Sequence, residues 1–378
     1  MNKATRLWRR WALVSAVLWV ISAGPAAALK FEYSGFASLT AGDILNGTLA
    51  NVNGYHCPCY LSNYEYAEFY QDDGWTLKPE TLAGIQGNLS FTKDFVATAQ
   101  LVYRTETYKT TPDWVYLTYK LDHQWTVQAG RKRLPLYYYS DYNYVGYAYP
   151  WVRPPVDVYG WEVYDYDGLS VSYRDELGDW SLDGQVYGGE RSTKNNLYEE
   201  QIYNFDRTHE SWFHIAGGFV NMSNDIFDIR LMFQYNIINE TEYPPGSPAV
   251  VDLYHQPQYI TGLAFNVDEK GFLLRSEFNV FMRPGEDNSQ QYAPSYFAGA
   301  GYRYRNFVGM YTESWYYERR TDNDSAPQRD HTHIVSVRWD FMPKWAAKME
   351  YDIFRDNSVD NSFYGNSQAL MVSVSTVF

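Results

Sequence analysis

The chain ends in Ala369-Leu-Met-Val-Ser-Val-Ser-Thr-Val-Phe378, a stretch in which two kinds of side chain alternate. Successive side chains of a β-strand point to opposite sides, so residues of one parity share a face. The even face is mainly apolar and comprises Leu370, Val372, Val374, Thr376 and Phe378. The odd face includes two serines and comprises Met371, Ser373, Ser375 and Val377. We therefore predict a final strand over 367–378.

Similar alternation recurs upstream, most clearly over 227–236. There the odd positions are apolar: Phe227, Ile229, Leu231, Phe233 and Tyr235. The even positions are mostly polar: Asp228, Arg230, Met232, Gln234 and Asn236. Segments 95–104 and 347–353 repeat the pattern. One face suited to lipid and one suited to water are typical of a transmembrane barrel that holds water.

Sixteen segments of the chain are candidate strands, and an even number returns both termini to one side of the membrane. They are 30–40, 81–91, 95–104, 113–120, 123–133, 168–174, 179–188, 211–221, 226–237, 258–266, 272–282, 294–304, 306–318, 331–341, 345–355 and 367–378. Short links alternate with long polar loops at 41–80, 105–112, 134–160, 188–210, 238–257, 283–293, 319–330 and 356–366. The fold class predicted is all-β, an antiparallel transmembrane barrel of about 16 strands.

Composition agrees with a barrel. The chain has 37 Tyr, 20 Phe and 13 Trp, and aromatic rings are enriched where a membrane meets water. Its mean hydropathy is −0.48, and no segment after the N-terminal leader has 18 consecutive apolar residues, which excludes a helical membrane protein. A formal charge of −14 argues against nucleic acid as a partner.

The first 28 residues have the pattern of a cleaved Sec-type signal peptide. Four basic residues precede an apolar core over 11–21, and Ala26-Ala27-Ala28 forms a small-residue cleavage site. An uncleaved anchor is the alternative, but Gly24 and Pro25 interrupt the apolar segment. Because residues 1–28 hold four basic and no acidic residues, cleavage would change the charge from −14 to −18. We expect residues 29–378 to form one barrel domain in the outer membrane of a Gram-negative cell.

Two further stretches carry a family resemblance. A final strand that ends in Phe378 resembles the signal by which outer-membrane barrels engage the barrel-assembly machinery, although an ordinary edge strand is the alternative. Gly130–Asp141 and Val145–Pro155 resemble the strand-to-loop junction of a group of proteobacterial porins, themselves similar to the general trimeric and phosphate-selective families. The segment around Leu82 to Arg104 resembles their early hairpin.

This resemblance implies a 16-stranded homotrimer with a water-filled lumen, narrowed where the third long loop folds inward. It also implies contact with outer-membrane lipid and lipopolysaccharide. The chain lacks the lysine cluster of the phosphate-selective porins, so phosphate transport is not carried over. The Cys-Pro-Cys at Cys57 to Cys59 is a second departure from the group.

Charged residues around the predicted lumen are the candidate site. The constriction set is Arg131, Lys132, Arg133, Asp141, Arg153 and Asp157. The inward positions of the strands add a basic set, Arg104, Arg174, Arg230, Arg275, Arg303 and Arg338, and an acidic set, Asp183, Asp228, Glu277, Glu350 and Asp352. These charges either form a transverse field that orients polar solutes or pair with one another to hold the loop. On the first interpretation, charge reversal at Arg153 shifts selectivity toward cations.

Three smaller features leave alternatives open. Seven tyrosines between Tyr137 and Tyr149 either form a stacking track for sugars or pack the loop against its surroundings. Cys57 and Cys59 form a disulfide or, with His56, bind a soft metal; we favour the disulfide. Acidic residues of the long loops either bind divalent cations that bridge to lipopolysaccharide or are simply solvated.

Catalysis has little support in the sequence. His331 and His333 near Asp330 are the one constellation of note, and no nucleophile motif accompanies them. We expect no enzyme activity, no cofactor and no metal. The function predicted is a porin for passive diffusion of small hydrophilic solutes and ions. The alternatives are a sugar- or anion-selective channel of the same fold and a structural or adhesive barrel.

Overall fold

A computed structural model describes residues 29–48, 57–64, 66, 68–160, 163–194, 207–284, 290–321, 327–358 and 365–378. The predicted signal peptide over 1–28 lies outside these ranges. Within the described ranges, no helix has the length and apolar character needed to cross a membrane.

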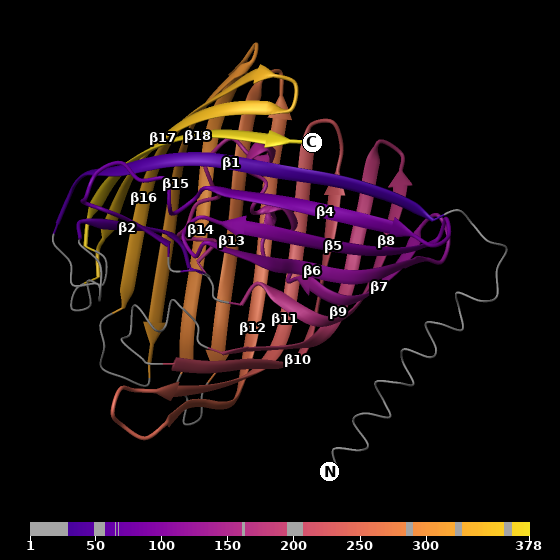
Figure 1. The fold of residues 1–378 in the computed structure, drawn as a ribbon, viewed down its shortest axis with the longest axis horizontal. Helices are drawn as coiled ribbons and strands as arrows, with labels where there is room; N and C mark the ends of the chain where they lie inside the picture. The colour runs from indigo at the N-terminus through magenta and orange to yellow at the C-terminus, as the bar shows by residue number, and fades with distance from the viewer. Residues whose placement is uncertain are drawn as a thin grey trace.

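Sixteen antiparallel strands form a closed barrel (Figure 1). They are β1 (Lys30–Gly47), β4 (Leu82–Ser90), β5 (Phe95–Arg104), β6 (Lys109–Lys120), β7 (Trp125–Arg133), β8 (Asp165–Leu177), β9 (Trp180–Lys194), β10 (Arg207–Ser223), β11 (Phe227–Tyr243), β12 (Val250–Glu269), β13 (Phe272–Pro284), β14 (Gln290–Tyr304), β15 (Phe307–Arg320), β16 (Gln328–Met342), β17 (Trp345–Asp356) and β18 (Ser367–Val377). Each of the sixteen predicted segments coincides with one of these strands, so the predicted fold class is confirmed.

The barrel closes because β1 pairs on both edges, with β4 and with β18. At the end of this seam Gly35 N donates to Phe378 O and Phe378 N donates to Gly35 O, both at 2.9 Å. A closed sheet leaves no edge whose N–H and C=O groups would face lipid unpaired. The C-terminal residue is therefore part of the ladder that completes the barrel.

The two faces of the sheet differ as the alternation predicted. On β11, Leu231 and Phe233 are 59% and 49% exposed, whereas Gln234 and Asn236 are fully buried. Apolar side chains thus cover the outside and polar ones the inside, the reverse of a soluble sandwich. We call the second set inward-facing.

The links at one end of the barrel are tight turns. Asp122 accepts hydrogen bonds from Gln124 N (2.8 Å) and Trp125 N (2.7 Å) in the β6–β7 turn. Lys270 and Gly271 between β12 and β13 have φ of 50° and 90°. Such left-handed residues match the twist of short hairpins. The long loops lie at the other end.

The first long loop contains a hairpin that the sequence did not predict. It consists of β2 (Cys59–Asn63) and β3 (Glu68–Gln71), and Cys57 and Cys59 are joined by a disulfide. Apolar residues of the hairpin pack against inward-facing residues of β17 and β18 and against residues after β7: Tyr60, Leu61, Phe69, Tyr70, Val152, Val156, Phe354 and Met371. This loop is thus tied to the barrel wall.

Candidate functional site

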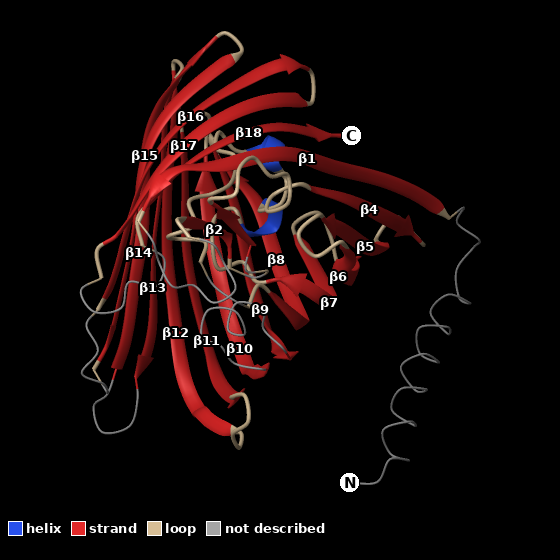
Figure 2. Cartoon of the chain, turned by 60° about the vertical axis from the view of Figure 1, so that its left-hand side comes forward, coloured by secondary structure: helices blue, strands red, loops and turns tan. Residues whose placement is uncertain are grey.

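The chain from residue 134 to 164, between β7 and β8, is the candidate site; we call it the inner segment. Its described part has no strand, in keeping with its four prolines, and two short 3-10 helices, η1 (Ser140–Tyr142) and η2 (Gly146–Ala148), drawn in blue in Figure 2. Its side chains and backbone contact inward-facing residues of β11, β13, β15, β16 and β17, far around the barrel from β7.

Basic side chains of the wall donate to backbone carbonyls of the inner segment. Arg230 Nη2 donates to Pro135 O at 3.1 Å. Arg338 Nη1 donates to Tyr147 O at 2.7 Å and Tyr149 O at 2.9 Å. Lys348 Nζ donates to the carbonyls of Gly146 and Trp151. The inner segment is not paired in a sheet, so its backbone carbonyls would otherwise be buried without a hydrogen-bond donor, and these cations supply the donors.

Acidic side chains of the wall serve the complementary donors. Glu277 Oε1 accepts from Tyr138 N at 2.9 Å, and its Oε2 accepts from Tyr159 Oη at 2.6 Å. Glu350 Oε2 accepts from Val152 N at 2.7 Å. The predicted wall residues Arg230, Arg338 and Glu277 are therefore engaged with the inner segment.

Arg153 is the most heavily paired residue of the segment. Its guanidinium lies 3.0 Å from Glu80 Oε1, 2.9 Å from Asp352 Oδ2 and 3.7 Å from Glu350 Oε1, and its side chain is 10% exposed. The ring of Tyr60 in the β2–β3 hairpin lies 4.9 Å away. One cation thus joins the inner segment, the first loop and β17.

Asp157 and Trp151 attach the segment to β15. Ser314 Oγ donates to Asp157 Oδ2, and Trp151 Nε1 donates to Thr312 Oγ1 at 2.9 Å. Asp157 is buried, and this burial raises the pKa of its carboxyl above the ordinary value. Loss of hydration destabilises the ionised carboxylate, and the hydrogen bond from Ser314 offsets part of this destabilisation.

The tyrosines of the segment pack on one another and on the wall. Tyr137 and Tyr159 have ring centroids 4.6 Å apart, and Tyr139 meets Trp151 edge-on at 5.8 Å. Tyr137, Tyr139 and Tyr149 are at most 4% exposed. Rings this buried do not present a face to a passing sugar, which favours the packing interpretation for these three, whereas Tyr138, Tyr142 and Tyr147 are half-buried.

A second charged group lies between β5, β6 and β7. Arg133 Nη2 is 2.7 Å and Arg104 Nη2 is 3.7 Å from Asp113 Oδ1. Both guanidinium groups lie over the ring of Tyr144, at 4.2 Å and 4.4 Å. Nearby, Arg131 Nε donates to Asp167 Oδ1 at 2.9 Å. A cavity of about 260 Å³ adjoins these residues.

Lys132 and Asp141 differ from the other constriction residues. Asp141 is exposed, and Lys132 Nζ donates to Gln128 Oε1 (2.5 Å) and Ser170 Oγ (2.8 Å). Neither makes an ion pair of 4.0 Å or less within the described ranges. They are the predicted pair that remains available to a solute.

Around Lys132 the inward faces of β4 to β9 carry uncharged polar groups. Trp114 Nε1 donates to Gln86 Oε1 at 3.1 Å, and Gln100 Nε2 donates to the same atom at 3.2 Å. Gln185 Nε2 donates to Ser172 Oγ at 2.9 Å. Amides and hydroxyls thus surround Lys132. Most hydrogen bonds of the inner segment go to β11 through β17, and its Tyr144 also lies against Arg104 and Arg133 of β5 and β7.

The remaining predicted wall residues lie toward the short turns. Arg275 Nη2 lies 2.8 Å from Asp268 Oδ2 and its Nη1 donates to Val267 O at 3.1 Å. Arg303, with its side chain half exposed, is 3.8 Å from Asp340. Among the described residues of the inner segment, none forms a hydrogen bond with Arg275 or Arg303. The structure therefore divides the predicted wall set into residues that hold the inner segment and residues that do not.

The sequence did not single out three residues that contribute to the site. Lys348 has the inward parity of its predicted strand, so that signal was available. Asp113 lies at an irregularity in the β5–β6 register, where parity no longer predicts direction. Glu80 closes a long polar loop and carried no signal. Parity arguments thus fail where strands bulge and where loops return to the wall.

Comparisons with known proteins give the fold only. No family model and no curated protein matches the sequence. The outer membrane channel DcaP of Acinetobacter baumannii superposes with a TM-score of 0.61 at 9% identity, covering 94% of this chain and 100% of that one. Vibrio cholerae OmpT in its trimer form gives 0.56 at 9% identity, covering 93% and 100%. An anion-selective porin from Comamonas acidovorans gives 0.55 at 11% identity, covering 93% and 100%. The chain therefore has the 16-stranded barrel fold of outer-membrane porins.

Proposed function

We propose that this protein is an outer-membrane channel through which small hydrophilic solutes and ions diffuse passively. The single observation that carries the proposal is the inverted barrel: apolar side chains outside, polar side chains inside and a sheet without edges. A barrel of about 16 strands is wide enough to leave an aqueous passage. Such a channel needs no catalytic residue.

The inner segment narrows this passage to one side. Its bonds hold it against β11, β13, β15, β16 and β17, and its Tyr144 also packs on Arg104 and Arg133, so we place the passage beside Lys132 and the polar side chains around it. Lys132 on the barrel wall and Asp141 on the segment supply opposite charges around a lining of amides and hydroxyls. Since most other charges are already paired, we expect weak ion selectivity.

An anion-selective channel is the alternative. Arg131, Arg133 and Arg191 adjoin the 260 Å³ cavity beside β6 to β9, where they face Asp113, Asp165 and Asp167. Against it, Arg133 pairs with Asp113 and Arg191 pairs with Asp165. Paired arginines attract a further anion weakly, which is why we place the general channel first.

Assembly and location complete the proposal. We infer a homotrimer in the outer membrane, surrounded by lipid and lipopolysaccharide, with Phe378 read by the barrel-assembly machinery. The trimer form of Vibrio cholerae OmpT, a barrel of the same fold, supports the oligomer. The outer face of β1 and β4 to β7 offers a shallow apolar surface of small residues, including Gly87, Ala97, Ala99 and Ala129.

Planar-bilayer recording of the purified protein under a salt gradient tests the function. We expect ohmic steps grouped in threes and a small reversal potential. A permeability ratio above roughly tenfold would refute the general channel and favour the anion-selective one. Traces that stay closed would favour a structural barrel. Protein that remains soluble without detergent, with no heat-modifiable electrophoretic mobility, would remove the barrel itself.

A further inference from the structure

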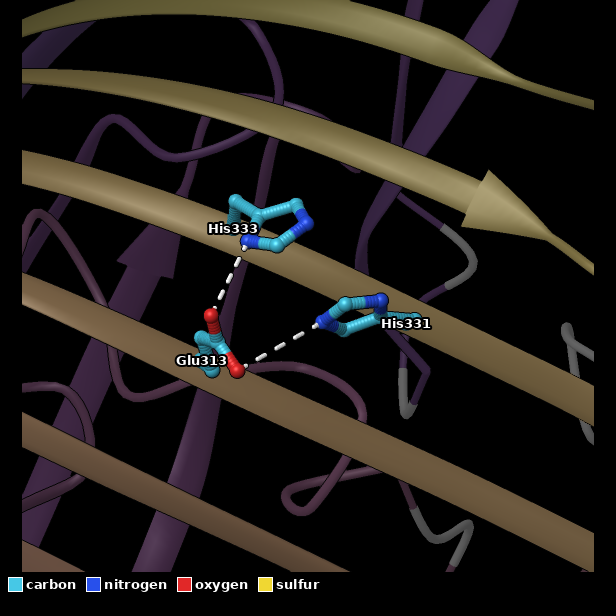
Figure 3. A group of neighbouring side chains, drawn as sticks. All are labelled: Glu313, His331 and His333. Atoms are coloured by element: carbon cyan, nitrogen blue, oxygen red, sulfur yellow. Dashed lines mark ion pairs between the residues drawn. The ribbon is translucent and has the colours of Figure 1, made fainter.

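Two histidines and a glutamate meet on adjacent strands, outside the site described above. Glu313 lies on β15, and His331 and His333 lie on β16 (Figure 3). Glu313 Oε1 is 3.5 Å from His333 Nδ1, and Glu313 Oε2 is 4.0 Å from His331 Nε2. One potential ligand atom from each residue lies within 4.8 Å of the others. Both imidazoles thus direct a nitrogen toward the same carboxylate.

The cluster is on the outer face of the barrel, near the long loops. Neighbours of the same parity, Tyr311 and Val335, are 46% and 49% exposed. His331 is four residues into β16, which begins at Gln328 after a long loop. Asp330, which the sequence grouped with the histidines, has the opposite parity and is 2% exposed. The carboxylate partner therefore comes from β15, across the ladder.

The distances suit a small divalent ion. Nitrogen and oxygen ligands lie about 2.0–2.2 Å from zinc, so two ligands of a tetrahedral ion are about 3.4 Å apart. The Glu313 Oε1–His333 Nδ1 distance is within 0.2 Å of that value. The three ligand atoms taken together lie within 4.8 Å of one another, so binding one ion requires the side chains of Glu313 and His333 to rotate toward the ring of His331 by up to about 1.4 Å.

The buried ring nitrogen of His331 also favours a bound cation. His331 Nε2 is buried and has no hydrogen-bond partner within the described ranges. Trp315 fixes its ring by stacking at a centroid distance of 3.5 Å. Tyr311 Oη lies 2.6 Å from Glu313 Oε1 and 2.8 Å from His333 Nδ1, which positions both groups. A carboxylate that faces the membrane is unfavourable unless a positive charge compensates it.

We propose that Glu313, His331 and His333 bind one Zn²⁺ ion at the outer membrane interface. Three protein ligands leave a fourth tetrahedral position for water. Two imidazoles and a single carboxylate favour zinc-like transition metals over Ca²⁺ and Mg²⁺, which require more oxygen ligands. The site is independent of the channel, because its side chains point away from the inner segment.

Zinc binding to the folded, chelator-stripped protein in detergent tests this proposal. We expect one Zn²⁺ per chain for the wild type by calorimetry, unaffected by excess Mg²⁺ or Ca²⁺. Glu313→Gln, His331→Ala and His333→Ala should each weaken binding at least tenfold. His123→Ala, which removes an exposed imidazole at the short-turn end, is the matched control and should bind as the wild type does.

Two readouts keep the test decisive. Heat-modifiable electrophoretic mobility reports whether each variant is folded. If His331→Ala disturbs the stacking on Trp315, Glu313→Gln still tests the site because it leaves both histidines in place. Co²⁺ in place of zinc should give visible absorption bands that the variants lose. Equal zinc binding by the wild type and the triple variant would overturn the proposal, as would displacement by Mg²⁺ or Ca²⁺. Channel recordings do not enter this test, so its failure is distinct from failure of the proposed function.

Discussion

Replacing Arg153 with methionine should release the inner segment. Methionine keeps most of the volume of the stem but removes the charge that faces Glu80, Glu350 and Asp352. Breaking a buried pair strands the partner charges, which costs about 3–5 kcal/mol. Since 1.4 kcal/mol corresponds to a factor of ten in an equilibrium constant, the population of the anchored state relative to released states should fall by about two to three and a half powers of ten.

That loss is large compared with the other anchors. A hydrogen bond to a charged group contributes about 1.5–3 kcal/mol, and Arg338, Lys348, Glu277 and Glu350 make such bonds to the segment. We therefore expect the segment to detach locally near Val152 while its ends stay attached. The barrel ladder is untouched, so heat-modifiable mobility should persist.

Single-channel recording measures the outcome. Arg153→Met should raise the mean conductance and add flicker, because a freed segment widens the passage. A shift of the reversal potential toward cations should accompany this change, because Glu80, Glu350 and Asp352 lose their counter-charge. Arg153→Lys should lie between wild type and Arg153→Met, since one ammonium cannot contact three carboxylates with the geometry of a guanidinium. Arg303→Met removes a half-exposed wall arginine and serves as the control.

The opposite pattern would refute this reasoning. If Arg153→Met left conductance and noise unchanged but moved the reversal potential toward cations, Arg153 would act as a field element facing solutes. The transverse-field interpretation would then hold at this position and the anchoring interpretation would not.

Three other substitutions test separate parts of the structure. Lys132→Glu should shift the reversal potential toward cations several-fold more than Arg303→Glu does; equal shifts would remove Lys132 from the passage. Burial raises the pKa of the Asp157 carboxyl in the folded protein. The stability that the protonated carboxyl contributes is therefore fully present below the ordinary aspartate pKa of about 3.9, and it is lost as the pH rises through the raised pKa of the folded state. Asp157→Asn should therefore raise the unfolding temperature at neutral pH and not in acid, and a pH-independent effect would contradict the burial argument. A Cβ at position 35 would lie 2.8 Å from Gly84 O and against the ring of Phe378, whereas a Cβ at position 309 would meet no atom within 4 Å. The refolding yield should therefore fall for Gly35→Ala and stay unchanged for Gly309→Ala.

The strands were predictable because membrane insertion imposes a period of two on each of them. The alternation over 227–236 and 367–378 required no knowledge of partners. Strand ends were less predictable: β12 runs over Val250–Glu269, against 258–266 expected, because a positive φ at His255 and register irregularities opposite it interrupt the alternation. The β2–β3 hairpin was missed because its strands of five and four residues are too short to show an alternating pattern.

The roles of the charged residues were only half predictable. Parity placed Arg230, Arg338 and Glu277 on the inside, but their partners are backbone atoms more than ninety residues away in sequence. No local pattern encodes such pairings. The sequence identified His331 and His333 as a pair. It did not identify Glu313, because only the pairing register of β15 and β16 places that residue beside the histidines.

The seam between β1 and β18 makes closure of the barrel depend on a pairing between its first and its last strand. Every other strand can pair with the one made just before or after it, but β1 must wait with an open edge until β18 arrives. A polypeptide cut before residue 367 would expose the ladder groups of both β1 and β17 to hydrocarbon. While β18 is unpaired, the open edges of β1 and β17 offer a template for pairing with other chains, so shielding these edges until the seam forms limits aggregation.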